Sequence, residues 1–266
     1  MNSPSFIARI RLPLLVSMIL VCVCAAFIYI ANRPNHKHLL HKKLGPVICI
    51  DPGHPSETNS ARIMQNGTNE LTMNWEVALK LASVLEKRYG VKTVMTKKSR
   101  DQFVRNHTRA IIGNESEADL TIHLHCDCGP SRGFTIYYPN RKGKLEGKEG
   151  PPPHVIRDSH KAAYELHDGM CAVLLGHLHD RGIKGDDNTR IGRVKGTLTV
   201  SAYSEVPTLT VEMVFLSSRH DAVFIKSEAG QEMMAQALAK GIANFLTTLG
   251  YKTEKGKFLN EPPIRR

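Results

Sequence analysis

The feature that most constrains this chain is the apolar run Val47-Ile-Cys-Ile50, which stops at Asp51-Pro-Gly-His54. Such a run followed by Pro52-Gly53 indicates a buried strand that ends abruptly in a turn. In open α/β sheets, binding and active sites lie just beyond the carboxyl ends of the strands. The turn therefore places His54 where such a sheet builds its site, and histidine is a favoured zinc ligand.

Strand and helix patterns alternate along the rest of the chain. We expect strands at residues 46–51, 91–96, 118–125, 133–138 and 206–215, and helices at residues 70–89, 105–114, 158–178 and 229–249. Residues 140–154 are charged, rich in glycine and end in three prolines, so they are expected to form an exposed loop. This alternation predicts an α/β fold, a single three-layer domain whose central mixed, mostly parallel sheet is flanked by helices.

Residues 12–31 carry no charge over 20 positions. At about 1.5 Å per residue, a helix of this length spans roughly 30 Å, the thickness of a bilayer's hydrocarbon core. No convincing small-residue cleavage site follows, so we predict an uncleaved N-terminal transmembrane helix, with a cleaved signal segment as the alternative. The predicted organisation is a short N-terminus (1–11), this segment (12–31), a basic linker (32–45), the folded domain (46–250) and a basic tail (251–266).

The charge balance narrows the classes of partner. Lys and Arg outnumber Asp and Glu by 36 to 25 in the 266 residues, a formal net charge of +11, which favours acidic partners. Aromatic residues make up only 6%, and no nucleic-acid-binding motif is present, so we expect no nucleic acid. The cysteines at positions 22, 24, 49, 126, 128 and 171 form no obvious disulfide framework, and Cys171 stands alone.

Four places in the chain supply the groups that a hydrolytic zinc site needs. A zinc hydrolase uses about three protein ligands and a separate carboxylate that moves the proton. His54, Glu70 and one histidine of His123-Leu-His125 are candidate ligands, and Glu212 in the last strand is the candidate base. Because alternate residues of a strand share a face, both histidines lie on one face, and His125 is nearer the carboxyl end.

These motifs, in this order, resemble the zinc-dependent N-acetylmuramoyl-L-alanine amidases, the catalytic domains of bacterial cell-wall amidases. The resemblance rests on the strand ending in DPGH, a Glu that opens a helix, ADLTIHLH at 118–125 and VPTLTVEMVFLS at 206–217, and it covers roughly residues 46–249. It implies that residues 46–250 are a zinc amidase domain in which His54, Glu70 and His125 bind Zn²⁺ and Glu212 acts in catalysis. The implied reaction is hydrolysis of the amide between N-acetylmuramic acid and L-alanine in peptidoglycan, in cell-wall remodelling.

The chain departs from the family pattern beside the metal. Pro55-Ser56 replaces the usual glycine pair, His123 stands where serine is commoner, and Asp127 stands where asparagine is expected. His123 and Asp127 are therefore candidates for hydrogen bonds to the ligands, and His123 could instead contact the zinc itself or be a buried, internally bonded histidine. Arg193 and Lys195 are candidates to help stabilise the oxyanion. The carboxylates Glu57 and Glu205 are worse placed than Glu212, and His167 is expected to be structural.

Two other functions stay open at this stage. One is a catalytically inactive protein that binds peptidoglycan or regulates its metabolism on the same scaffold, although all four site positions are retained. The other is a zinc hydrolase of another amide. For the amidase, we expect peptidoglycan and, through the N-terminal helix, a membrane as partners, with an activator protein as a candidate. The expected location is the bacterial inner membrane, with the domain in the periplasm or the wall space.

Overall fold

A central six-stranded sheet organises the domain. The computed structural model describes residues 44–57, 60–145 and 147–263, and the sheet order is β2-β1-β3-β8-β4-β7. The strands are β1 (Val47–Pro52), β2 (Lys92–Met95), β3 (Leu120–Asp127), β4 (Phe134–Tyr138), β7 (Asp180–Gly185) and β8 (Thr208–Phe215). As far as the residues of this sheet are described, its one antiparallel pair is β4–β8, so the prediction of a mixed, mostly parallel sheet is confirmed.

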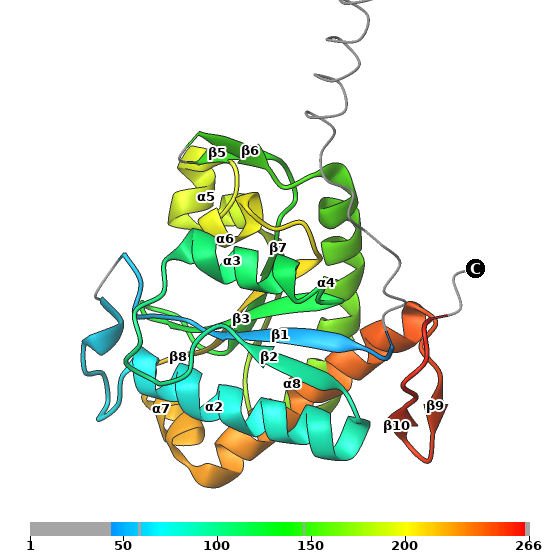
Figure 1. Ribbon diagram of the computed structural model, residues 1–266. Helices are drawn as coiled ribbons and strands as arrows, with labels where there is room; N and C mark the ends of the chain where they lie inside the picture. Colours follow the sequence, from blue (N-terminus) through cyan, green and yellow to red (C-terminus); the bar gives the residue numbers. More distant parts are fainter. Residues whose placement is uncertain (1–43, 58–59, 146, 264–266) are drawn as a thin grey trace, which may run out of the picture. The chain divides into compact units, whose positions relative to one another are not determined.

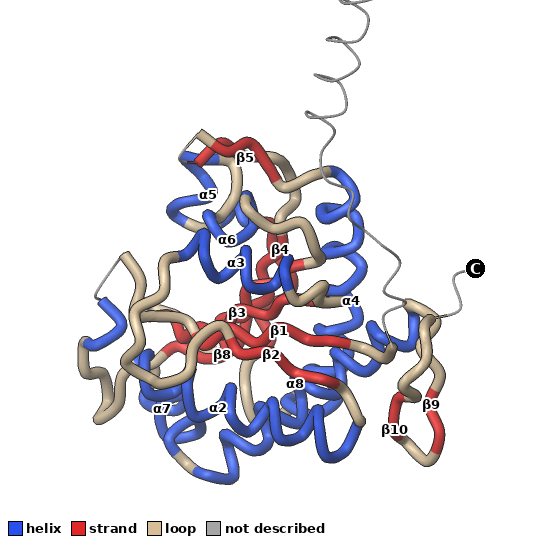
Figure 2. Tube along the Cα trace, in the orientation of Figure 1, coloured by secondary structure: helices blue, strands red, loops and turns tan. Residues whose placement is uncertain are grey.

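Helices cover both faces of the sheet, as the three-layer prediction requires (Figures 1 and 2). Figure 1 shows α2, α7 and α8 on one side and α3, α5 and α6 on the other. The helices are α2 (Glu70–Val84), α3 (Asn106–Glu115), α4 (Pro153–Leu174), α5 (Arg190–Lys195), α6 (Thr199–Ala202), α7 (Arg219–Lys226) and α8 (Glu228–Thr248).

The two faces of the sheet differ in polarity. Ile50, Ile122 and Val211 point into the apolar core with α2, α4 and α8. In this layer α4 and α8 approach closely, because a Cβ on Gly169 would lie 2.2 Å from the backbone nitrogen of Gly241. The opposite face carries buried polar groups such as Thr121, His123 and Thr208. The alternation read from the sequence thus separates the core from a polar face on which a site can form.

Several element boundaries differ from those expected. α4 begins at Pro153 rather than 158, because proline is favoured in the first helical turn, where a backbone N–H needs no partner. The expected loop at 140–154 contains a short hairpin, β5 (Gly143–Leu145) and β6 (Lys148–Gly150). The helix expected to end at residue 89 finishes as a π-helical turn, Leu85–Tyr89, and Gly90 follows with a φ of 68°.

The segment expected to be a basic tail also contributes to the domain. Residues after 250 form the hairpin β9 (Thr253–Glu254) and β10 (Lys257–Phe258), and Tyr251 and Phe258 are buried in the core. The packed domain therefore extends past the expected boundary at residue 250, because the two aromatic side chains bury their large apolar surfaces in the core.

The predicted transmembrane segment, residues 12–31, lies outside the described residues. Within residues 44–57, 60–145 and 147–263, no helix is long and apolar enough to cross a membrane.

Candidate metal centre

The structure brings His54, Glu70 and His125 together at one edge of the sheet. Glu70 Oε1 lies 2.8 Å from His125 Nδ1 and 3.4 Å from His54 Nε2. The two imidazole rings meet edge to face with their centroids 5.0 Å apart. Three side chains that are distant in the sequence thus converge on one point.

Local structure explains this convergence. β1 and β3 are parallel neighbours, and the Gly53 N–H donates to the Leu124 carbonyl (2.9 Å), so His54 and His125 emerge at the same edge. Asn69 caps α2 by accepting from the Thr72 N–H (2.9 Å), which sets Glu70 at the first helical position.

Electrostatics favour an ionised carboxylate between the two imidazoles. Burial alone would raise the pKa of Glu70, but its hydrogen bonds with His125 and His54 hold that pKa well below its usual range. Burial lowers the pKa of His125. An acceptor carboxylate and an imidazole that resists protonation are the forms in which both groups bind a cation.

The spacing fits a zinc ion. Ligand atoms about 2.0–2.1 Å from a tetrahedral zinc lie roughly 3.3 Å from one another. The separations of 2.8 and 3.4 Å bracket this value, and all three donor atoms lie within 4.8 Å of one another. Two nitrogens and one carboxylate oxygen form a donor set that zinc hydrolases use, and it leaves a coordination position for water.

Glu212 lies beside this cluster as a separate carboxylate. It pairs in register with His125 across β3 and β8, so both side chains leave the same face of the sheet. Its Oε2 is fully buried and has no hydrogen-bond partner among the described residues. Burial, with the nearby charges of Glu70 and Asp127, raises the pKa of Glu212 well above its usual range.

Comparison with known proteins decides the family. A family model described as N-acetylmuramoyl-L-alanine amidase matches residues 48–244, which is most of the chain. The chain belongs to this family. The prediction of a cell-wall amidase, a hydrolase, is thereby confirmed.

Individual relatives are distant in sequence. The chain is 26% identical over 204 residues to the endolysin of Bacillus phage SPP1 and 26% identical over 200 residues to the sporulation-specific N-acetylmuramoyl-L-alanine amidase of Bacillus subtilis. These alignments cover 76% and 75% of this chain but only 67% and 66% of the relatives. The chain therefore spans about two thirds of the length of these relatives.

Solved structures share the fold. Ami1 from Mycobacterium smegmatis aligns with a TM-score of 0.62 and 20% identity, covering 77% of this chain and 99% of that one. AmiC2 of Nostoc punctiforme aligns with a TM-score of 0.60 and 21% identity, covering 76% of this chain and 97% of that one. At these identities the likeness concerns the fold alone.

In this amidase the His125 ring leaves no room for a side chain at position 53, which is glycine. A Cβ on Gly53 would lie 2.5 Å from His125 Nε2 and 2.8 Å from Nδ1, far inside van der Waals contact. The imidazole can move away, but it then leaves the position that faces Glu70. We predict that Gly53→Ala lowers zinc affinity by about 10–100-fold, as displacement of a ligand's support does. Zinc competition titration measures this, and an unchanged affinity would contradict the prediction.

Asn74, which no sequence motif indicated, supports Glu70. Its Nδ2 donates to Glu70 Oε1 (3.4 Å) and to the Gly53 carbonyl (3.3 Å), and the residue is buried. The spacing of four residues on α2 was the available signal, since such residues are neighbours on a helix. Asn74 thus links the first helical turn to the DPGH turn.

His123 and Asp127, the two candidates for hydrogen bonds to the ligands, have other partners. His123 is buried; its Nδ1 donates to Asp51 Oδ2 (2.7 Å), and its Nε2 forms a hydrogen bond with Thr208 Oγ1 (3.0 Å). Of the alternatives left open for His123, these contacts fit the buried, internally bonded histidine. Asp127 follows a shift in the β3–β8 register, and its Oδ1 accepts from the Cys128 N–H (2.7 Å).

Asp51 of the DPGH turn is the centre of a buried network. Arg109 of α3 donates to its Oδ1, to the Pro52 carbonyl (3.1 Å) and to the Pro55 carbonyl (2.9 Å), and so clamps both sides of His54. Burial opposes ionisation of Asp51, but the Arg109 charge and the His123 hydrogen bond hold its pKa well below the usual range. This network positions the turn without touching the cluster of ligands.

We predict that Asp51→Asn destabilises the fold by about 3–5 kcal/mol at pH 7, because Arg109 keeps a buried charge without its partner. The folded-state pKa of Asp51 is depressed, so its contribution is fully present above the unfolded pKa of about 4 and is lost progressively as the pH falls from there toward the folded-state pKa. The difference in stability between wild type and variant, measured by urea unfolding, should therefore begin to shrink below about pH 4 and keep shrinking as the pH falls further.

Asp101→Asn is the control for this variant. Asp101 forms an exposed ion pair with Arg62 (2.9 Å), so its removal should cost less than about 1 kcal/mol. If Asp51→Asn and Asp101→Asn lost the same free energy of unfolding, the buried network would contribute no more stability than an exposed ion pair, which would contradict the prediction.

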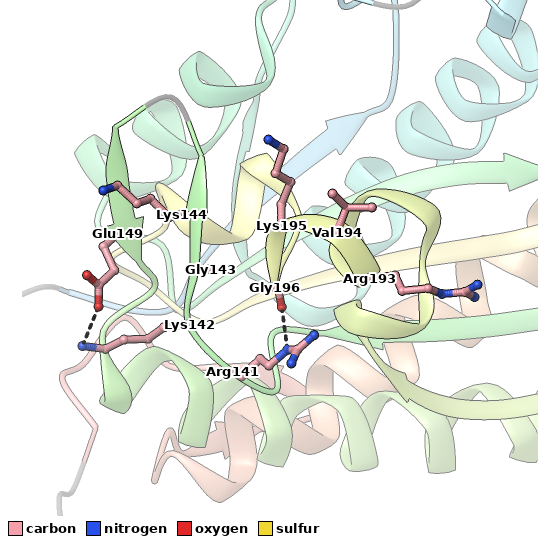
Figure 3. Close-up of a pocket in the computed structure, with 9 residues that line it drawn as sticks. All are labelled: Arg141, Lys142, Gly143, Lys144, Glu149, Arg193, Val194, Lys195 and Gly196. Atoms are coloured by element: carbon pink, nitrogen blue, oxygen red, sulfur yellow. Dashed lines mark hydrogen bonds and ion pairs between the residues drawn. The ribbon is translucent and has the colours of Figure 1, made fainter.

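Arg193 and Lys195 line a separate basic pocket of about 480 Å³ (Figure 3). Arg141, Lys142 and Lys144 contribute its other positive charges. Lys142 lies 3.8 Å from Glu149 and Arg141 lies 3.7 Å from Asp187. Among the described residues, no carboxylate lies within 4 Å of the charged groups of Lys144, Arg193 or Lys195. None of the three ligands or Glu212 lines this pocket. Its positive charges therefore suit the binding of an anion and do not contact the ligand cluster.

Proposed function

We propose that this chain hydrolyses the amide bond between N-acetylmuramic acid and L-alanine in peptidoglycan with zinc bound by His54, Glu70 and His125. The observation that carries the proposal is the juxtaposition of this ligand cluster with Glu212, a half-buried residue whose buried Oε2 has no partner among the described residues. Membership in the amidase family supports the same reaction.

Each residue has a definite task in this reaction. His54 and His125 would bind the ion through ring nitrogens and Glu70 through a carboxylate oxygen. When bound, zinc polarises the amide carbonyl and makes water acidic enough to be deprotonated near neutral pH. Glu212 takes the proton of the attacking water at a carboxylate oxygen and returns it to the nitrogen of the leaving L-alanine. A raised pKa suits a group that must hold a proton between these two transfers.

Digestion of purified sacculi tests the activity. The zinc-loaded full chain should release peptides that begin with a free L-alanine amine and leave glycan strands intact. Release of new sugar reducing ends, or no release of peptide, would contradict the proposal. A panel of other amides in the same assay tests the alternative of a zinc hydrolase with another substrate.

The location of the domain is also a proposal. We infer that residues 12–31 anchor the chain in the inner membrane and that residues 46–250 form the catalytic domain in the periplasm or wall space. The inference is supported by the absence of charge over residues 12–31 and by the location of peptidoglycan outside the inner membrane. Recovery of the full chain in a soluble fraction after lysis would contradict the anchor. One structural relative, the CwlD amidase of Clostridioides difficile, was solved in complex with the GerS lipoprotein, which supports an activator partner here.

The basic pocket fits the carboxylate-rich peptide stems or anionic polymers of a cell wall. We predict that Lys144→Glu, Arg193→Glu and Lys195→Glu together weaken binding to sacculi by about tenfold at low salt, since each exposed charge contributes about 0.2–1 kcal/mol. The difference from wild type should shrink as salt rises. Co-sedimentation with sacculi measures both.

A matched control carries the same change in net charge elsewhere. Lys252, Lys255 and Lys257 are exposed on the C-terminal hairpin, so their triple replacement by Glu leaves the pocket intact. Equal weakening in both triple variants would show that total charge, rather than the pocket, binds the wall.

A further inference from the structure

A second group of side chains that could hold a metal ion lies away from the first, beside the edge strand of the sheet. His167 and Cys171 are four residues apart on α4, so they share one face of the helix. Asp180 begins β7, the last strand in the sheet order. Strands β8 and β4 lie between β7 and β3, so no ligand is shared with the first cluster.

The three donor atoms form a triangle of the size that a tetrahedral ion requires. His167 Nε2 lies 3.0 Å from each Asp180 oxygen and 3.5 Å from Cys171 Sγ, and Sγ lies 3.5 Å from Asp180 Oδ2. For zinc bonds of about 2.0–2.3 Å, the expected separations are roughly 3.3 Å between nitrogen and oxygen and roughly 3.5 Å from sulfur to either. The geometry therefore needs little rearrangement to accept an ion.

The surroundings hold these side chains in place. The Gly182 N–H donates to Asp180 Oδ1 (2.7 Å), which leaves Oδ2 directed at the sulfur and the imidazole. The Phe134 ring packs against His167 with centroids 6.3 Å apart, and the Asp168 carboxylate lies 3.9 Å from His167 Nδ1. The side chains of His167 and Asp180 are 21% and 29% exposed, so an ion and a water ligand can reach them.

We propose that His167, Cys171 and Asp180 bind a second zinc ion, with water as the fourth ligand. Nitrogen, thiolate and carboxylate donors together suit zinc, whereas calcium and magnesium prefer oxygen alone. Without an ion, the Cys171 thiol donates to Asp180 Oδ2 (3.5 Å), and a bound ion would take the place of this proton between the sulfur and the carboxylate. Its role is structural: it ties the C-terminal half of α4 to the edge strand β7, whose one strand partner among the described residues is β4.

Cobalt substitution distinguishes this site from the first one. Thiolate bound to Co²⁺ gives an intense near-ultraviolet charge-transfer band, and His54, Glu70 and His125 include no sulfur. The cobalt-loaded full chain should show this band, and Cys171→Ser should abolish it. The band should persist in His125→Ala, which breaks the first cluster, so the two sites fail independently. Cys128→Ser is the matched control, because Cys128 is an exposed free thiol and could bind cobalt adventitiously.

Zinc content gives a second readout. The zinc-loaded wild type should retain about two ions per chain after dialysis, and Cys171→Ser and His167→Ala about one each. Zinc should also raise the melting temperature of His125→Ala, and adding Cys171→Ser should remove that rise. The proposal is overturned if wild type shows no thiolate band, if the band follows Cys128, or if Cys171→Ser leaves the zinc content unchanged.

Discussion

Glu212→Gln should lower the rate of peptide release from sacculi by about 10²–10⁴-fold, the contribution of a positioned proton-transfer group. The amide has the shape of the carboxylate but cannot take a proton from water. Zinc content should not change, because Glu212 is not in the ligand cluster. The loss should appear in kcat rather than KM, since the group acts on the transition state. Steady-state kinetics on a soluble muropeptide and metal analysis check both points.

Glu205→Gln is the matched control for this substitution. Glu205 is an exposed carboxylate 3.9 Å from Lys148, and it precedes the same strand. Its replacement should leave the rate within a factor of about two, since exposed ion pairs contribute little. Full activity in Glu212→Gln, or loss of its zinc, would show that Glu212 is not the base.

Removal of zinc should abolish the activity, and His125→Ala should prevent its recovery. His125 supplies one of three ligand atoms, and loss even of a residue that supports a ligand costs about 10–100-fold in metal affinity. We therefore expect the zinc affinity of the first site to fall by more than about 100-fold. Chelation followed by zinc titration, with sacculus digestion at each point, should restore wild type and not His125→Ala.

His177→Ala controls for the loss of a histidine as such. His177 is exposed after α4 and lies near Phe224, with ring centroids 6.5 Å apart, outside both candidate metal sites. It should regain full activity with zinc, as wild type does. If chelated enzyme stays active, or if His125→Ala recovers fully, the ligand assignment is wrong.

Much of this site could be predicted because its signals are local. An apolar run before DPGH indicates a strand end, and an Asn before Glu70 indicates the start of a helix. Parallel neighbours then bring the ends of β1 and β3 to one edge, which is why His54 and His125 meet. Alternation along β3 also separates His125 from the apolar Leu124 without knowledge of the structure.

Other features depend on which distant segments pack together. His123 has the same local pattern as His125, and only the presence of Asp51 and Thr208 on its two sides shows that it is bonded internally. Three consecutive prolines end at Pro153, and each of them could stand in the first turn of a helix. The sequence alone therefore did not identify Pro153 as the start of α4.

The sequence by itself determined the fold class, the family and the positions from which His54, Glu70, His125 and Glu212 emerge. Strand and helix periodicities depend on neighbouring residues, and motif order survives at low identity. Only the tertiary structure decided that Arg109 neutralises Asp51 and that Asp180 faces His167 and Cys171. These contacts join residues from separate elements, and their free energy arises from burial and charge compensation that no local pattern encodes.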